Sequence, residues 1–189
     1  NQPILNWDNY SPPKPKETGI EILKDFDLSQ LRNYIDWTPF FSTWELKGKY
    51  PNIFEDVYVG EEAKKLFDDA QKMLDQLISK KILTANGIVG IFEAFEDQGD
   101  IILPENQVTF NCLRQQRKMG NNIPNRSLAD FIAPKNAGKK DYLGAFAVTT
   151  GIGIEKIVEK YEKDQDDYNS ILVKAIADRL AEAFAEYLH

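Results

Sequence analysis

The sequence contains a single cysteine and a single histidine, and each scarcity excludes a kind of site. With Cys112 alone the chain cannot form an internal disulfide, which is typical of a protein from a reducing compartment. A zinc site built of cysteine and histidine is excluded, as is a cluster held by several thiolates. Because the one histidine, His189, is the last residue, we expect no Ser-His-Asp or Cys-His catalytic arrangement. Carboxylates remain as possible acids, bases or magnesium ligands, but there is no DxDxDG-type loop and we expect no metal site.

Long hydrophobic runs are also missing. No apolar stretch approaches the ~20 residues that span a bilayer, and the first ten residues, NQPILNWDNY, lack the basic and then apolar pattern of a signal peptide. Positive charge is scarce relative to negative charge, since the formal net charge is −7. A nucleic-acid or anionic-membrane partner requires a basic face, so we expect neither. These absences favour a cytoplasmic protein.

The length of 189 residues, with 42% hydrophobic residues, is sufficient for one substantial core. Residues 1–16 hold four prolines among polar residues, a composition typical of an extended arm or linker. We therefore expect an arm over 1–16 and a domain over 17–189. The chain begins with asparagine and ends inside a helical pattern, so we expect it to be a piece of a longer polypeptide.

The periodicity of apolar residues predicts long helices and a small antiparallel sheet. The turn signal Asn86-Gly87 and the loop at 97–100 separate short strand patterns, and connections this short predict a meander. The patterns therefore combine an antiparallel meander with helices. The predicted strands are Gly19–Leu23, Ile88–Phe95, Ile101–Leu103, Gln107–Leu113 and one from Leu143; the predicted long helices are Gly60–Lys81, Ile154–Lys163 and Asp167–His189.

The last predicted helix places acidic residues along one face. Asp178, Glu182 and Glu186 follow at steps of four, opposite the apolar stripe. Lys174 and Arg179 are spaced to neutralise part of this acidic face. The face is either a solvated exterior with ion pairs or a docking surface for a neutral or cationic partner.

A second feature is the aromatic-rich segment IDWTPFFSTWELKGKYP, which covers Ile35–Pro51. Thr38 and Pro39 fit the N-cap and first residue of a helix, which places Asp36 in the turn before it. The clustered aromatic residues indicate either a folded corner of the core or a recess in which Asp36 and aromatic faces hold a cation.

Several segments, taken in order from about Ile35 to the last residue, closely resemble one family. They are IDWTPFFSTWELKGKYP, LRQQ at 113–116, LADFIAP at 128–134, DYLGAFAVTTG at 141–151 and DDYNSILVKAIADRLAEAFAEYLH at 166–189. They resemble the C-terminal activation domain of cobalamin-dependent methionine synthase. The resemblance implies an α+β fold, with a twisted antiparallel sheet flanked by long helices, which agrees with the predicted meander. It also implies a role in reactivating a methyltransferase whose cobalt has been oxidised to cob(II)alamin. In that family S-adenosylmethionine remethylates the cobalt while flavodoxin or a flavoprotein reductase supplies an electron.

The resemblance also assigns residues. Asp36 matches the family's aspartate that holds S-adenosylmethionine, whose ammonium and sulfonium groups suit a carboxylate and aromatic faces. Asp178 and Glu182 match residues at the interface with the cobalamin domain, near the histidine released from cobalt, and Glu182 also lies close to the S-adenosylmethionine site in the family. The resemblance implies no covalent catalytic residue. Cobalamin and zinc are implied only in other domains of the parent enzyme.

Some family motifs are absent. The chain ends before the family's RxxxGY and PACPEH motifs, and it contains no DxHxxG motif for cobalamin. We therefore expect a domain incomplete at its C-terminus that binds S-adenosylmethionine weakly or not at all and is inactive alone. An alternative function is a non-catalytic docking module that caps the cobalamin domain and contacts an electron-transfer protein. A further alternative is an acid-base enzyme that uses Asp178 and Glu182.

Overall fold

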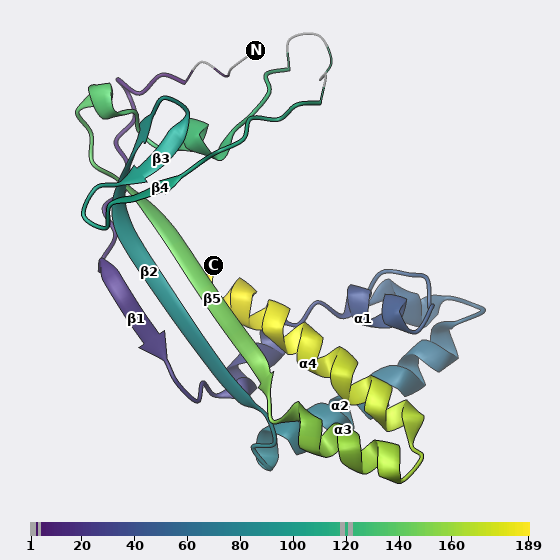
Figure 1. Cartoon of the computed structure of the whole chain (residues 1–189). Helices are drawn as coiled ribbons and strands as arrows, with labels where there is room; N and C mark the ends of the chain where they lie inside the picture. Colours follow the sequence, from purple (N-terminus) through teal and green to yellow (C-terminus); the bar gives the residue numbers. More distant parts are fainter. Residues whose placement is uncertain (1–2, 4, 118–119, 121–122) are drawn as a thin grey trace. The chain divides into compact units, whose positions relative to one another are not determined.

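The computed structural model describes residues 3, 5–117, 120 and 123–189 and has a mixed helical and antiparallel architecture (Figure 1). This confirms the predicted α+β class. The strands are β1 Gly19–Leu23, β2 Thr84–Asp97, β3 Asp100–Leu103, β4 Val108–Phe110 and β5 Asp141–Ile152. The α-helices are α1 Trp37–Thr43, α2 Gly60–Ser79, α3 Ile154–Lys163 and α4 Asp167–Leu188; the 3-10 helices are η1 Leu28–Tyr34, η2 Asn52–Glu55, η3 Leu128–Phe131 and η4 Lys135–Ala137. Within the described residues, no helix is both long and apolar enough to cross a membrane.

The strands form one sheet in the order β1-β2-β3-β4, and β5 also pairs with β2. The β2–β3 and β3–β4 pairs are antiparallel, with Phe95 opposite Ile102 and Ile102 opposite Thr109. The predicted meander is therefore confirmed, although β4 is shorter than the predicted strand. The chain folds into two compact units, one of Asn1–Glu21 with Val89–Ala145 and the other of Ile22–Ile88 with Phe146–His189.

The first unit has a small core and several polar anchors. Its buried apolar residues are Ala94, Ile101, Leu103, Ala129 and Ile132. Arg114 donates two hydrogen bonds to the buried carboxylate of Asp130, at 2.6 and 2.7 Å, and Asp130 also accepts from the backbone of Ser127. These contacts hold the loop before η3 without regular structure.

The described part of the N-terminal segment is anchored in the same unit. The ammonium of Lys139 donates to the backbone carbonyl oxygens of Trp7, Asp8 and Tyr10. Residues 1, 2 and 4 of the predicted arm lie outside the described residues. The division into an arm over 1–16 and a domain over 17–189 stays a prediction.

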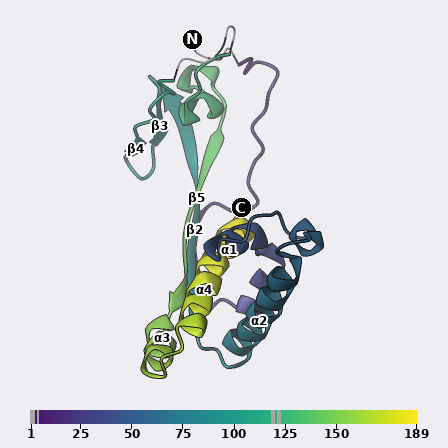
Figure 2. The same cartoon turned by 90° about the vertical axis from the view of Figure 1, so that its right-hand side faces the viewer.

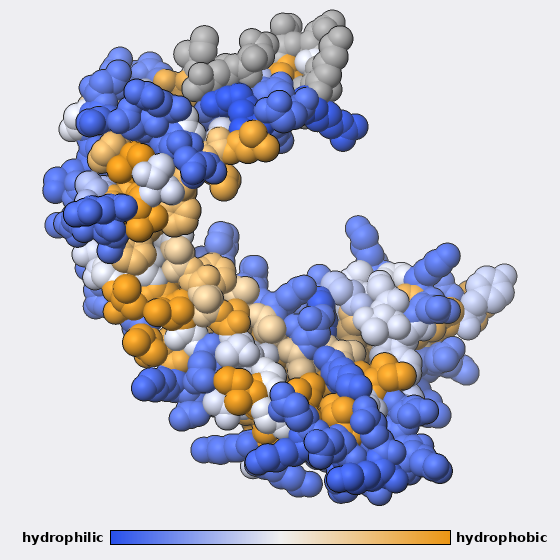
Figure 3. All heavy atoms as spheres, in the orientation of Figure 1, coloured by the Kyte–Doolittle hydropathy of each residue, from blue (hydrophilic) through white to orange (hydrophobic). Residues whose placement is uncertain are grey.

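The second unit has the larger core, which is built around α4. Helices α1, α2 and α3 all contact α4, and Figure 2 shows α2 beside it and α3 at its N-terminal end. The apolar stripe predicted from the sequence is buried, with Leu172, Ile176 and Leu180 at most 1% exposed. Polar side chains take the outer faces, and hydrophilic residues predominate along the lower edge of the surface, over α3 (Figure 3).

The predicted turn at Asn86-Gly87 is wrong, because β2 runs straight through it. A Cβ on Gly87 would lie 2.9 Å from the ring of Phe184 in α4, so glycine serves here for close packing rather than for a turn. The side chain of Asn86 accepts a hydrogen bond from the backbone of Asp25 at 3.0 Å. Both residue types are explained by tertiary contacts within the second unit.

Asp166 provides the N-cap of α4, and its loss should lower thermal stability in a pH-dependent way. Its carboxylate accepts from the side chain and backbone of Asn169, at 2.7 and 3.0 Å, and these hydrogen bonds hold its pKa below the ordinary value. An aspartate whose pKa is lower in the folded state than in the unfolded state stabilises the fold. This contribution is fully present above the unfolded-state pKa, and it disappears as the pH falls through the folded-state pKa. We expect Asp166→Ala to lower the midpoint of thermal unfolding at neutral pH, and the difference from the wild type to disappear as the pH falls through the lowered pKa of Asp166.

Circular dichroism across this pH range measures the effect. Asp164→Ala is the matched control, because the side chain of Asp164 makes no hydrogen bond within the part of the chain that the structure describes. Equal losses of stability in the two variants at neutral pH would contradict the capping role.

Candidate functional site

Asp36 is itself the N-cap of α1. One carboxylate oxygen, Oδ1, accepts from the backbone of Thr38 at 2.9 Å, whereas the other has no hydrogen-bond partner among the described residues. The prediction that Thr38 caps this helix is therefore wrong, because the aspartate reaches the second helical amide and caps better than threonine. The hydroxyl of Thr38 instead accepts from the backbone of Tyr50 at 3.2 Å.

The aromatic residues that follow Asp36 belong to the core. Trp37, Phe40 and Phe41 are at most 6% exposed, and the rings of Trp37 and Phe67 meet edge to face at 4.9 Å. The sequence allowed either a folded corner of the core or a recess that holds a cation. For these three residues the first interpretation is correct, because they are buried in the core. The aromatic ring that does lie beside Asp36 at the surface is Tyr34, at the end of η1.

A surface hollow of about 540 Å³ brings Asp36 together with the acidic face of α4. It is lined by Asn33, Tyr34, Ile35, Asp36, Glu182 and Glu186. Residues from the η1–α1 connection form one side, and two residues one turn apart in α4 form the other. The ring of Tyr34 is held edge-on against Tyr187, with ring centroids 5.3 Å apart. Carboxylates and one tyrosine in one hollow suit a ligand with positive charge.

Arg179 connects Glu182 to Asp178. Its guanidinium donates to both oxygens of Glu182, at 2.8 and 3.1 Å, and to Asp178 at 2.6 Å. The side chain of Arg179 is 10% exposed, whereas those of Asp178 and Glu182 are 70% and 65% exposed. Burial alone would lower the pKa of Arg179, but the hydrogen bonds that it donates to Asp178 and Glu182, together with their negative charges, raise it. Arg179 thus holds the carboxylates of Asp178 and Glu182 in place, and the remaining lone pairs of their oxygens are open to solvent.

Asp178 does not line the hollow, and among the described residues it is linked to Glu182 through Arg179. The prediction that Lys174 neutralises it is wrong, because the ammonium of Lys174 instead lies 3.4 Å from Glu162 in α3. Among the described residues, no group of three or more His, Cys, Asp or Glu side chains is placed to hold a metal ion. The carboxylates that line the hollow can accept hydrogen bonds and attract cations.

The sequence does not indicate every part of the site. Tyr34 has no pattern that marks it as a site residue, although it is 43% exposed and lines the hollow. The prediction that Arg179 neutralises part of the acidic face is confirmed by its ion pairs with Asp178 and Glu182. Its burial is not indicated by the sequence, because a single helix pattern does not reveal how widely α4 is covered.

Comparisons with known proteins identify a family and a similar solved structure. A family described as vitamin B12 dependent methionine synthase, activation domain, matches residues 27–189. A solved structure titled as the crystal structure of the MetH reactivation domain bound to AdoHcy is 49% identical in sequence, with a TM-score of 0.91. The match covers all of this chain and 59% of that chain, so the present sequence spans about three fifths of the length of its structural neighbour.

Proposed function

The chain belongs to the family of activation domains of vitamin B12-dependent methionine synthase, and from this premise we propose that it supports reductive remethylation of cob(II)alamin with S-adenosylmethionine. The parent protein is then a methyltransferase acting on 5-methyltetrahydrofolate and homocysteine, in the cytoplasm. The observation that carries the proposal is that Asp36 and Glu182, far apart in sequence, line one hollow.

The residues present fit the positively charged end of S-adenosylmethionine. The free oxygen of Asp36 and the carboxylates of Glu182 and Glu186 provide negative charge for an ammonium or a sulfonium, and Tyr34 provides an aromatic face. The neighbouring structure with 49% identity was solved with AdoHcy, which carries the same amino-acid end. Asp36 and Glu182 are accordingly proposed as ligand-binding residues.

The methyl donor, when bound, supplies the methyl group, and the cobalt of another domain supplies the nucleophile. This chain contributes position and electrostatics, and no side chain here acts as a covalent catalyst. Asp178 and Glu182 are proposed to meet the cobalamin domain and to accept hydrogen bonds from an imidazole there. Arg179 keeps both carboxylates in place before that domain arrives.

The proposed partners are the cobalamin domain of the same polypeptide and, for electron delivery, flavodoxin or a flavoprotein reductase. The exposed carboxylates of Asp178 and Glu182 also support the second candidate, a docking module without a methyl-donor site of its own. The two candidates differ in whether the hollow binds S-adenosylmethionine.

Asp36→Asn should weaken S-adenosylmethionine binding by about tenfold or more, because a hydrogen bond to a charged group is lost while an amide still caps α1. Isothermal titration calorimetry on this chain, and on the parent chain extended through an RxxxGY segment, measures the affinity. Asp56→Asn is the matched control, because Asp56 also accepts backbone hydrogen bonds, from Tyr58 and Val59 in the turn before α2, and lies outside the hollow. Absence of binding by both wild-type forms would contradict the donor site and leave the docking role.

A further inference from the structure

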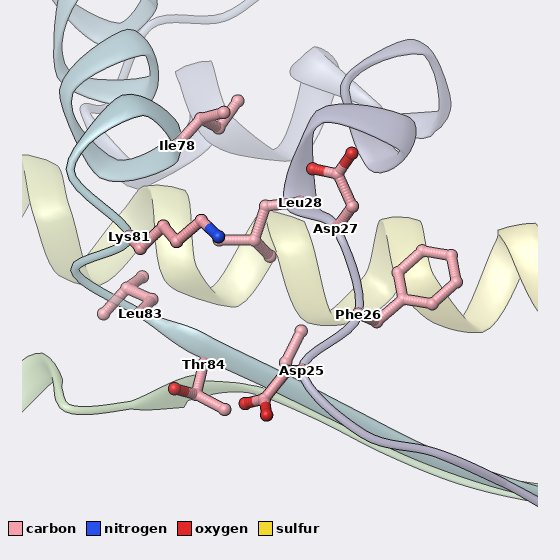
Figure 4. A pocket seen from close by; sticks show the side chains of 9 residues that line it. Asp25, Phe26, Asp27, Leu28, Ile78, Lys81, Leu83 and Thr84 are labelled. Carbon is pink, nitrogen blue, oxygen red and sulfur yellow. The ribbon is translucent and has the colours of Figure 1, made fainter.

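A second hollow in the same unit has a different chemical character from the first. It has a volume of about 590 Å³ and lies between the segment after β1 and the end of α2 (Figure 4). Its floor is apolar, since Leu28, Leu83 and Ala85 are at most 5% exposed. None of its lining residues is shared with the hollow at Asp36.

Two residues of this hollow have backbone conformations that side chains normally avoid. Asp25 has φ 49° and Lys81 has φ 48°, both in the left-handed region. Lys81 follows the C-cap of α2, a position where glycine is the usual residue, and a Cβ in this conformation costs about 1–2 kcal/mol. The fold therefore retains two charged side chains at positions where glycine would be easier to accommodate.

These two side chains carry opposite charges, and the charge of Lys81 also acts on Asp27, whose pKa is held below the ordinary value mainly by hydrogen bonds from Ser29 and to a smaller extent by Lys81. Within the described residues, neither the ammonium of Lys81 nor the carboxylate of Asp25 takes part in an ion pair or a hydrogen bond. Figure 4 shows Lys81 extending across the hollow, with Asp25 on the facing segment. The nearby Asp27 has a structural role. Its carboxylate accepts hydrogen bonds from the backbone and hydroxyl of Ser29, at 2.9 and 2.7 Å, and caps η1.

We propose that this hollow binds a free α-amino acid with an apolar side chain. Lys81 receives the carboxylate of the ligand and Asp25 receives its ammonium. The floor of Leu28, Leu83 and Ala85 takes the apolar side chain out of water. A purely anionic ligand is disfavoured by Asp25 and Asp27, and a purely cationic ligand by Lys81. The inference is independent of the function proposed for Asp36 and Glu182.

An NMR titration of the whole chain with L-leucine tests the proposal. We expect saturable shifts of backbone amides at Phe26, Lys81 and Thr84, with weak, millimolar affinity because the rim is exposed. Lys81→Asn and Asp25→Asn should each weaken binding about three- to fivefold. Asparagine tolerates the left-handed backbone, so both variants should keep the fold. Lys80→Asn is the matched control, since Lys80 is adjacent in sequence but does not line the hollow.

Blocked ligands separate the two charges. N-acetyl-L-leucine lacks the ammonium and L-leucine methyl ester lacks the carboxylate, so each should bind more weakly than L-leucine to the wild type. The ester should be insensitive to Lys81→Asn and the acetylated form insensitive to Asp25→Asn. The proposal is wrong if no saturable shift occurs up to about 50 mM, if the shifts map to other residues, or if either charge variant binds L-leucine as the wild type does.

Discussion

Phe184→Ala should lower the free energy of unfolding by about 3–5 kcal/mol. The ring of Phe184 is fully buried and stacks on Phe26, with centroids 4.6 Å apart. It also fills the space above Gly87. Truncation removes these contacts and leaves a cavity that α4 and β2 are too rigid to close. Urea denaturation followed by circular dichroism measures the loss.

Phe146→Ala is the control for this experiment, because Phe146 belongs to the same unit and is 42% exposed. A comparable loss in both variants would show that Phe184 has no special place in the core. Gly87→Ala probes the same contact from the other side, because its methyl group would overlap the ring and cost about 1–3 kcal/mol. In the double variant the two costs should not add, since removal of the ring makes room for the methyl group.

The combined replacement Asp178→Asn and Glu182→Gln in the parent methyltransferase should slow its recovery from cobalt oxidation by about tenfold or more. The proposal assigns these carboxylates the task of accepting hydrogen bonds from the cobalamin domain, and a neutral amide accepts such bonds more weakly. The measurement is the rate at which activity returns after oxidation, with a reductant and S-adenosylmethionine present.

Stability has to be followed in parallel, because the double replacement leaves the buried Arg179 without its two anions. Each single variant retains one partner and should show a smaller loss in the reactivation rate with a near-normal melting temperature. Glu155→Gln, in the first turn of α3, is the control for a change in surface charge. Unchanged recovery in the folded double variant would remove the functional role of this pair and favour a solvated helix exterior.

Much of the fold was predictable because several segments have strong patterns. The strand Gly19–Leu23 and the helix Ile154–Lys163 were predicted with the bounds observed, and the apolar stripe of α4 is buried as its spacing indicated. Turn chemistry was less informative. Asn86-Gly87 is typical of a hairpin turn, but its local preference is overridden by Asp25 on one side and Phe184 on the other.

The site was predictable only in part. The family resemblance pointed to Asp36 and Glu182, and the structure places them in one hollow, although their roles stay predictions. Nothing in the local sequence indicated that Tyr34 would provide the aromatic surface while Trp37 turns into the core. Which of the two rings is exposed depends on how η1 and α1 are oriented against α4. This orientation is a property of the tertiary structure.

The arrangement around Arg179 has a consequence for ionic strength. Two carboxylates and one guanidinium leave a single net negative charge at this position, and the remaining attraction for a cation acts over a Debye length of about 8 Å in physiological salt. Added salt should therefore weaken docking onto this face only modestly. A partner would find it mainly by matching hydrogen-bond geometry at close range, rather than by long-range electrostatic steering.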